Sequence, residues 1–218
     1  MNKASNLILD YRVRKPKTPN QSPPVLFLLH GYGSHEEDLF SFADHLPDQY
    51  LIISLRAPLS LGFGGYAWYT IHFTESSDKW NDKEEAIAAQ ELLRFNIDHH
   101  LKQFALGSKK VSLLGFSQGA IISWAIGLSH PEKIDKIIAL SGYLNEDIFH
   151  YAEKGTDELR CFSSHGTQDP TIAVEWTRKG IEILKHKGIQ VTYKEYPMGH
   201  GINPENFNDL MQWLNANP

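Results

Sequence analysis

Residues 111–129 read VSLLGFSQGAIISWAIGLS, and they indicate the fold more directly than any other part of the chain. The first six residues form an apolar run typical of a buried strand, and the apolar residues after Gly119 are typical of a covered helix. Between them Gly115-Phe-Ser117-Gln-Gly119 fits the pattern G-x-S-x-G, in which a sharp turn from strand to helix exposes a serine hydroxyl. The pattern alone also occurs in ordinary Gly-Ser turns. With a strand before it and a helix after it, it predicts that Ser117 is a nucleophile.

Strand-like and helix-like segments alternate on both sides of this stretch. Apolar runs predict further strands at residues 25–29, 51–55, 136–140, 160–164 and 190–196, and helical patterns predict helices at residues 36–46, 86–104, 118–129, 172–187 and 204–214. Such alternation is typical of an α/β fold with a mainly parallel central sheet and helices on both faces. Because no repeat or linker interrupts it, we expect a single domain over residues 1–218.

Two segments depart from this alternation. Residues 6–13 precede a proline-rich stretch at residues 15–24, and the pair predicts an antiparallel hairpin that enters the sheet. Residues 58–82 form the longest irregular stretch, whose many aromatic residues argue against disorder. We expect this stretch to cover the sheet edge, to form a wall of the substrate pocket, or both. Its candidate substrate-binding residues are Phe63, Tyr66 and Trp68.

A serine hydroxyl needs a base that takes its proton, and the base needs an acid that orients it. In folds with this turn, the acid and then the histidine follow the serine along the chain. His200 is the candidate base because it lies in a short loop between two glycines, whereas His130 and His186 are expected at exposed helix positions. Asp169 is the candidate acid because it directly follows a predicted strand, although it could also cap the next helix.

The tetrahedral intermediate of acyl transfer carries an oxyanion, which needs hydrogen-bond donors already in place. The backbone N–H of Gln118 directly follows the nucleophile and is the first candidate donor. The second is the N–H of Tyr32, in a loop whose glycines let the backbone approach the substrate. His30, at the start of that loop, is expected to hold the loop rather than to act as a base.

Together these motifs resemble the phospholipase/carboxylesterase family, which includes the acyl-protein thioesterases. The resemblance covers nearly the whole chain and implies an α/β-hydrolase fold without a large cap domain. It also implies a Ser-His-Asp triad that acts without a cofactor on a small acyl ester, and family members are often dimeric, which makes a homodimer an alternative to a monomer. It rests on Leu29-His-Gly-Tyr-Gly33, Arg56-Ala-Pro58, Gly115-Phe-Ser-Gln-Gly119, Leu140-Ser-Gly142, His165-Gly-Thr-Gln-Asp-Pro170 and Gly199-His200.

Composition limits the other functions. The 218 residues carry a formal net charge of -5, which argues against a nucleic-acid surface. No stretch approaches the roughly 18 apolar residues of a membrane span, and no signal peptide is recognised, so we expect a cytoplasmic protein. The only cysteine, Cys161, cannot form an internal disulfide. His99 and His100 are adjacent rather than spaced as a ligand pair on one helix face, so no metal is expected.

Three alternatives to a carboxylic ester hydrolase stay open at this stage. A thioesterase or a lysophospholipase would use the same triad and differ in its acyl and leaving-group pockets. A protein of this fold could also bind a ligand without turnover, because fold alone does not prove activity.

Overall fold

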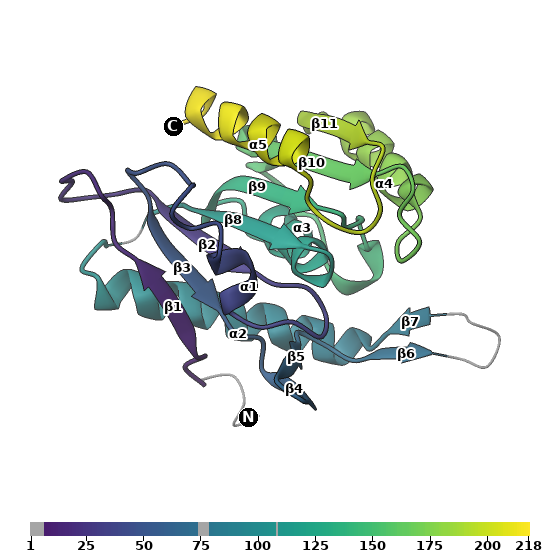
Figure 1. Cartoon of the computed structure of the whole chain (residues 1–218), viewed down its shortest axis with the longest axis horizontal. Helices are drawn as coiled ribbons and strands as arrows, with labels where there is room; N and C mark the ends of the chain where they lie inside the picture. Colours follow the sequence, from purple (N-terminus) through teal and green to yellow (C-terminus); the bar gives the residue numbers. More distant parts are fainter. Residues whose placement is uncertain (1–6, 74–78, 108) are drawn as a thin grey trace.

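The computed structural model describes residues 7–73, 79–107 and 109–218. Strands and helices alternate along most of the chain, and the central strands run side by side through the middle of the molecule (Figure 1). The elements are β1 (Tyr11–Arg14), β2 (Val25–Leu29), α1 (Glu37–Phe40), β3 (Leu51–Leu55), β4 (Leu59–Gly62), β5 (Gly65–Ala67), β6 (Ile71–Phe73), β7 (Lys79–Asn81), α2 (Lys83–Gln103), β8 (Val111–Phe116), α3 (Gln118–Ser129), β9 (Ile134–Leu140), η2 (Glu146–Ile148), η3 (Thr156–Glu158), β10 (Arg160–Gly166), α4 (Val174–His186), β11 (Val191–Tyr196) and α5 (Pro204–Ala216).

The main sheet has seven strands in the order β1-β3-β2-β8-β9-β10-β11. All neighbouring pairs are parallel except β1 and β3, which confirms the predicted mainly parallel sheet. The strand order reverses between β2 and β8, because β3 lies on one side of β2 and β8 on the other. In open α/β sheets such a reversal leaves a crevice at the carboxyl ends of the strands, where ligands bind.

The predicted N-terminal hairpin is wrong. Strand β1 does not pair with the next strand in the chain but lies antiparallel to β3, with Tyr11 opposite Leu55. Strand β2 already has parallel neighbours on both sides, so β1 can join the sheet only at its edge. The half-exposed pattern of β1, in which Val13 is 37% exposed, suits an edge strand.

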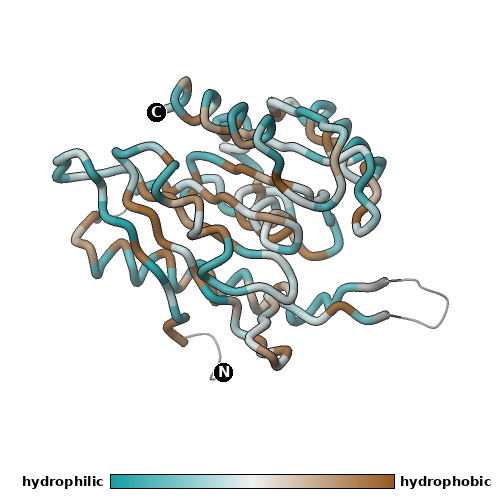
Figure 2. The backbone as a smooth tube through the Cα atoms, in the orientation of Figure 1, coloured by the Kyte–Doolittle hydropathy of each residue, from teal (hydrophilic) through white to brown (hydrophobic). Residues whose placement is uncertain are grey.

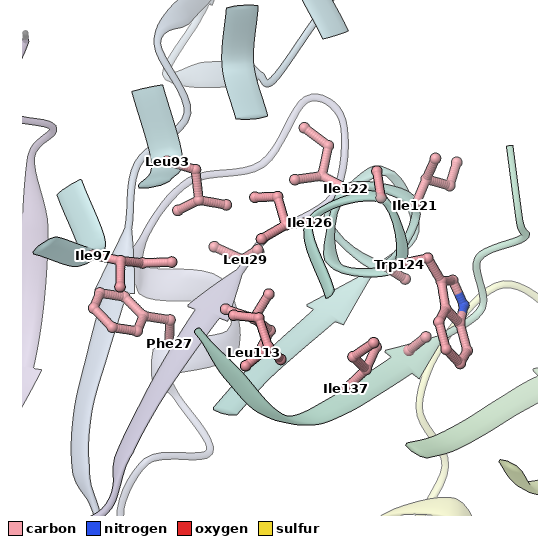
Figure 3. Packing of buried hydrophobic residues seen from close by; sticks show 14 of the residues in the cluster. Phe27, Leu29, Leu93, Ile97, Leu113, Ile121, Ile122, Trp124, Ile126 and Ile137 are labelled. Atoms are coloured by element: carbon pink, nitrogen blue, oxygen red, sulfur yellow. The ribbon is translucent and has the colours of Figure 1, made fainter. Parts of the chain in front are cut away.

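The core lies on both faces of the sheet, because alternate residues of a strand point to opposite faces. On one face, Phe27 and Leu29 of β2 belong to a hydrophobic cluster that also includes residues of α2, α3 and α4; on the other, Leu26 and Leu28 belong to a cluster with residues of α1 and α5. Figure 3 shows α3 from close by, with Ile126 directed toward Leu29 of β2 and Leu93 of α2. Apolar residues accordingly gather in the central strands, whereas the outer surfaces of the helices are more polar (Figure 2). Among the described residues, no helix is both long and apolar enough to cross a membrane.

Two predicted segments differ in detail from the structure. Helix α1 ends at Phe40, and the N–H groups of Phe42, Ala43 and His45 bond to the carbonyl three residues earlier, which makes residues 41–46 a series of turns rather than an α-helix. Residues 58–82, expected to be irregular, contain two antiparallel hairpins, β4–β5 and β6–β7. The β6–β7 hairpin projects from the body of the molecule (Figure 1).

A buried carboxylate joins α1 to the sheet. Glu36 is 1% exposed and accepts two hydrogen bonds of 2.6 Å from Nε and Nη2 of Arg56, which follows β3. Its own backbone carbonyl accepts a hydrogen bond from the hydroxyl of Ser54. The hydrogen bonds from Arg56 lower the pKa of Glu36, outweighing burial, which would raise it. This ion pair therefore stabilises the fold at neutral pH, where both groups are charged.

We expect Glu36→Gln to lower the free energy of unfolding by about 2 to 3 kcal/mol at pH 7, because Arg56 loses a buried charged partner. Since the pKa of Glu36 is lowered by folding, the contribution is complete above the ordinary carboxyl range and is lost as the pH falls through the native pKa. Urea denaturation between pH 7 and pH 4 measures both effects. Glu37→Gln, at a neighbouring exposed carboxylate, is the control and should change stability by less than about 0.5 kcal/mol. An equal effect of the two substitutions would contradict the assignment.

Candidate active site

Ser117 lies in the turn between β8 and α3 in a conformation that non-glycine residues rarely adopt, with φ 53° and ψ −116°. Such a backbone costs about 1 to 3 kcal/mol and persists only where its surroundings fix it. Glycines permit the start of α3 to approach β2 and β8 closely. A Cβ on Gly119 would lie 2.0 Å from the carbonyl oxygen of Leu29, and one on Gly115 would lie 2.3 Å from Gly119. The sequence pattern around Ser117 therefore forms the predicted sharp turn.

The structure brings the three predicted triad residues together. Nε2 of His200 lies 3.0 Å from the hydroxyl oxygen of Ser117, and Nδ1 of His200 lies 2.6 Å from Oδ2 of Asp169. The Ser117 and His200 side chains retain slight exposure, whereas the Asp169 side chain is fully buried. The three residues follow β8, β11 and β10, whose carboxyl ends meet at one edge of the sheet. This arrangement can move a proton from Ser117 to His200.

Asp169 is held as a carboxylate by surrounding donors. Its Oδ1 accepts hydrogen bonds from the backbone N–H groups of Thr171 and Ile172, at 2.8 and 3.0 Å. Burial would raise the pKa of Asp169, but the hydrogen bonds from Ile172, His200 and Thr171 outweigh it and lower the pKa. Asp169 thus stays ionised and can hold the imidazole of His200 in one orientation. It also caps the following turn, so the two roles weighed from the sequence coexist.

The loop with His200 is joined to the loop with Asp169 by backbone contacts. The N–H of Thr167 donates to the carbonyl of Tyr196, and the N–H of Gln168 donates to that of Met198. A Cβ on Gly166 would lie 2.3 Å from the carbonyl oxygen of Met198, so only glycine lets the two loops come this close. The distance between acid and base is therefore set by main chain rather than by flexible side chains.

The predicted oxyanion donors belong to two segments that lie close together at Ser117. Gln118 is the first residue of α3, where a backbone N–H has no partner within the helix. Tyr32 lies in the loop after β2, and a Cβ on the neighbouring Gly31 would come within 3.3 Å of the Cβ of Ser117. In the described part of the chain, neither the Tyr32 nor the Gln118 amide donates to a protein acceptor. Both are free to bind an oxyanion.

His30 holds this loop, as the sequence suggested. Its Nδ1 donates to the carbonyl of Gly31, and its Nε2 accepts from the N–H of Ala57. Burial lowers the pKa of His30, which keeps the ring neutral and able to accept this bond. On the other side of the loop, the N–H of Gly33 donates to the carbonyl of Tyr66, and the N–H of Tyr66 donates to Ser34.

The structure places the three predicted substrate-binding residues in three different surroundings. Phe63 lies at the tip of the β4–β5 hairpin and is fully exposed. The ring of Tyr66 lies 4.7 Å from the guanidinium of Arg56. Trp68 is 1% exposed, and its indole N–H donates to the carbonyl of His30. Trp68 therefore supports the candidate oxyanion loop from behind.

A cavity of about 250 Å³ opens at Ser117 and His200. Its walls come from elements far apart in the sequence: Tyr143 follows β9, Trp176 belongs to α4, and Ile71 and Asn81 belong to the β6–β7 hairpin. Ile71 and Asn81 lie in residues 58–82, which were named from the sequence as a candidate pocket wall, although neither residue was singled out. Sequence reasoning missed Trp176 and Tyr143; Tyr143 closely follows the end of a predicted central strand, which is a usable signal. The remaining lining residues are Tyr32, Gln118, Ile121, Thr171 and Ile172.

Side-chain contacts define the far wall of this cavity. The amide of Asn81 donates to the hydroxyl of Tyr143 at 2.8 Å, and the rings of Tyr143 and Trp176 meet edge to face at 5.2 Å. A second hollow of about 580 Å³ lies beyond and shares these three residues. Among the described residues, no cluster of three or more His, Cys, Asp or Glu side chains could hold a metal ion.

Comparison with known proteins agrees with this geometry. The sequence model of the family described as Phospholipase/Carboxylesterase matches residues 10–217. The chain is 25% identical to acyl-protein thioesterase 1 of Mycosarcoma maydis over 231 residues, covering 95% of this chain and 96% of the relative. The crystal structure of esterase PE8 is 25% identical, with a TM-score of 0.79 over 97% of this chain and 100% of the other. The Bacillus cereus carboxylesterase is 21% identical and shares the fold, with a TM-score of 0.84 over 98% of this chain and 97% of that one.

Trp68→Phe should lower kcat/KM up to about tenfold for every ester tested, because the loop loses the hydrogen bond to the carbonyl of His30 and the smaller phenyl ring leaves part of the buried indole site unfilled. The measurement is kcat/KM for p-nitrophenyl esters of several chain lengths. Phe63→Ala, at the exposed hairpin tip, should leave all rates unchanged. A loss confined to one chain length would instead place Trp68 in the acyl pocket.

Proposed function

Because the chain belongs to the phospholipase/carboxylesterase family, we propose that it hydrolyses carboxylic esters through an acyl-enzyme formed on Ser117. The observation that carries this proposal is the continuous relay from Ser117 through His200 to Asp169, with distances of 3.0 and 2.6 Å, at the mouth of a cavity. A relay with these distances is the arrangement that nucleophilic acyl transfer needs.

In the first stage, the hydroxyl oxygen of Ser117 attacks the carbonyl carbon of the ester while its proton passes to Nε2 of His200. The carbonyl oxygen takes up the electron pair and accepts hydrogen bonds from the N–H groups of Tyr32 and Gln118. When the intermediate collapses, the ester C–O bond breaks and His200 gives its proton to the leaving alcohol. Water then repeats the sequence on the acyl-enzyme and releases the acid.

The cavity favours a short to medium apolar acyl chain, because isoleucine and aromatic side chains make up much of its wall and Tyr143 and Asn81 separate it from the neighbouring hollow. A thioester is the second candidate substrate, because relatives that match most of the chain are named acyl-protein thioesterase 1. A lysophospholipid would need the same triad. The proposal further includes a small-molecule partner, the cytoplasm as compartment, and a homodimer as an alternative to a monomer.

Ser117→Ala should lower kcat for p-nitrophenyl esters by about four to six orders of magnitude, because the attacking oxygen is lost. Ser22→Ala, at an exposed serine far from the site, should have full activity. In the wild type, activity should fall as the pH becomes acidic, because a protonated His200 cannot accept the serine proton. The lowered pKa of Asp169 keeps its carboxylate out of this transition. Retained activity in Ser117→Ala, or a flat profile down to about pH 5, would exclude the mechanism.

Tyr143→Ala should shift the chain-length optimum toward longer esters, because the cavity would then open into the neighbouring hollow. Rates with esters from acetate to palmitate measure the shift, and we expect a gain of about tenfold or more for the longest chains relative to acetate. Tyr143→Phe removes only the hydrogen bond with Asn81 and should keep the wild-type optimum. An unchanged optimum in Tyr143→Ala would show that the acyl chain lies elsewhere.

A further inference from the structure

A second histidine lies behind the triad. His165, near the end of β10, is completely buried, and its Nε2 lies 3.1 Å from Oδ2 of Asp169. The same Nε2 donates to the carbonyl of Ile172 at 2.9 Å. His200 approaches the same Oδ2 atom at 2.6 Å. The carboxylate of Asp169 therefore lies between two imidazole rings, of which only His200 has a role in the proton transfer.

The protons of His165 can be counted from its partners. Nε2 contacts a carbonyl and a carboxylate, both of which only accept, so Nε2 must carry hydrogen. Nδ1 lies 2.8 Å from the hydroxyl of Thr177, and that hydroxyl lies 2.7 Å from the carbonyl of Gly142. A hydroxyl has one hydrogen, and the carbonyl of Gly142 can only accept it. With that hydrogen used, Nδ1 must donate to Thr177, so both ring nitrogens carry hydrogen.

A neutral ring would leave this buried network unsatisfied. If the Thr177 hydroxyl donated to Nδ1 instead, its oxygen would face the Gly142 carbonyl oxygen at 2.7 Å with no hydrogen between them. Within the part of the chain that the structure describes, the Gly142 carbonyl accepts no other hydrogen bond. A buried acceptor without a donor costs about 1 to 3 kcal/mol, so the geometry favours the ring with two hydrogens.

The charges around His165 can support a cation. Asp169 supplies the adjacent negative charge, and its own pKa is lowered, so it is ionised. Glu195 of β11 is the register partner of His165 and adds a second carboxylate, which is shared with Arg178 of α4 at 2.8 and 2.6 Å. His200 lies across Asp169 and is a further titratable neighbour. A buried charge of this kind needs a paired counterion and hydrogen bonds, and both are present.

We propose that His165 is a positioning residue held as an imidazolium at neutral pH, which fixes Asp169 from behind and opposes protonation of His200. The proposal rests on the proposed function for its effect on catalysis, but the charge of His165 can be tested without turnover. A positive charge beside Asp169 offsets part of the attraction between this carboxylate and a protonated His200. His200 would therefore stay neutral, and able to act as a base, to lower pH than Asp169 alone would allow.

The first test is ¹⁵N NMR of the whole protein labelled at its histidines, at pH 8. We expect one-bond couplings to hydrogen on both ring nitrogens of His165, with Ser117→Ala giving the same result because it leaves the network intact. His165→Gln removes the signals of His165 and so assigns them. Thr177→Val replaces the hydroxyl that Nδ1 contacts by a methyl group and should remove the Nδ1 hydrogen, so it tests the proposal even if His165→Gln does not fold. An Nδ1 without hydrogen in the wild type would overturn the proposal.

The second test is the pH profile of kcat/KM. His165→Gln and Thr177→Val should move the acidic limb to higher pH by about one unit, because a charge close to His200 is lost. Thr177→Ser keeps the hydroxyl and should restore the wild-type limb. A general loss of rate without a shift of the limb would show a purely structural role and overturn the coupling to His200. If the wild type cleaves no ester or thioester, the proposed function fails, and the same shift can be read from the NMR titration of the His200 C2 proton.

Discussion

The contact between helix α3 and strand β2 sets the geometry of the whole site. Gly119 lies so close to the carbonyl of Leu29 that a Cβ would come within 2.0 Å of it. Because α3 starts at this distance, Ser117 is forced into its strained conformation, and the loop that continues β2 is brought beside it. The strain at Ser117 is borne by the buried strands β2 and β8, which cannot relax without opening the core.

The other half of the site depends on a similar approach at the opposite side of the crevice. Gly166, at the end of β10, allows the loop after β11 to come into backbone contact, and this fixes His200 relative to Asp169. Parallel strands place these ends at one edge of the sheet. The nucleophile, base and acid therefore come from the loops after β8, β11 and β10, whose spacing follows from strand pairing rather than from side-chain packing.

The dependence of the site on strand ends and close backbone contacts explains which features the sequence could predict. Central strands were predicted almost to the residue, because a strand buried on both faces is a continuous apolar run. The triad positions followed from glycine patterns at strand ends, which reflect local backbone needs. The pairing of β1 with β3 and the two hairpins in residues 58–82 were not predictable, because they depend on which strand edges and surfaces remain free after the rest has folded.

The residues that line the cavity were likewise difficult to predict from the sequence. Trp68 and Tyr143 are both aromatic residues near the site, yet one supports the loop at His30 from behind and the other lines the cavity. No local pattern separates these roles, because they depend on the direction in which distant elements present each ring. The proton relay is built from short-range backbone geometry, whereas the cavity beside it is lined by the segment after β9, by α4 and by the β6–β7 hairpin, which can vary without disturbing the relay. A fold with this division can keep one chemistry while its substrate changes, because the residues that line the cavity are mostly not those that hold the nucleophile.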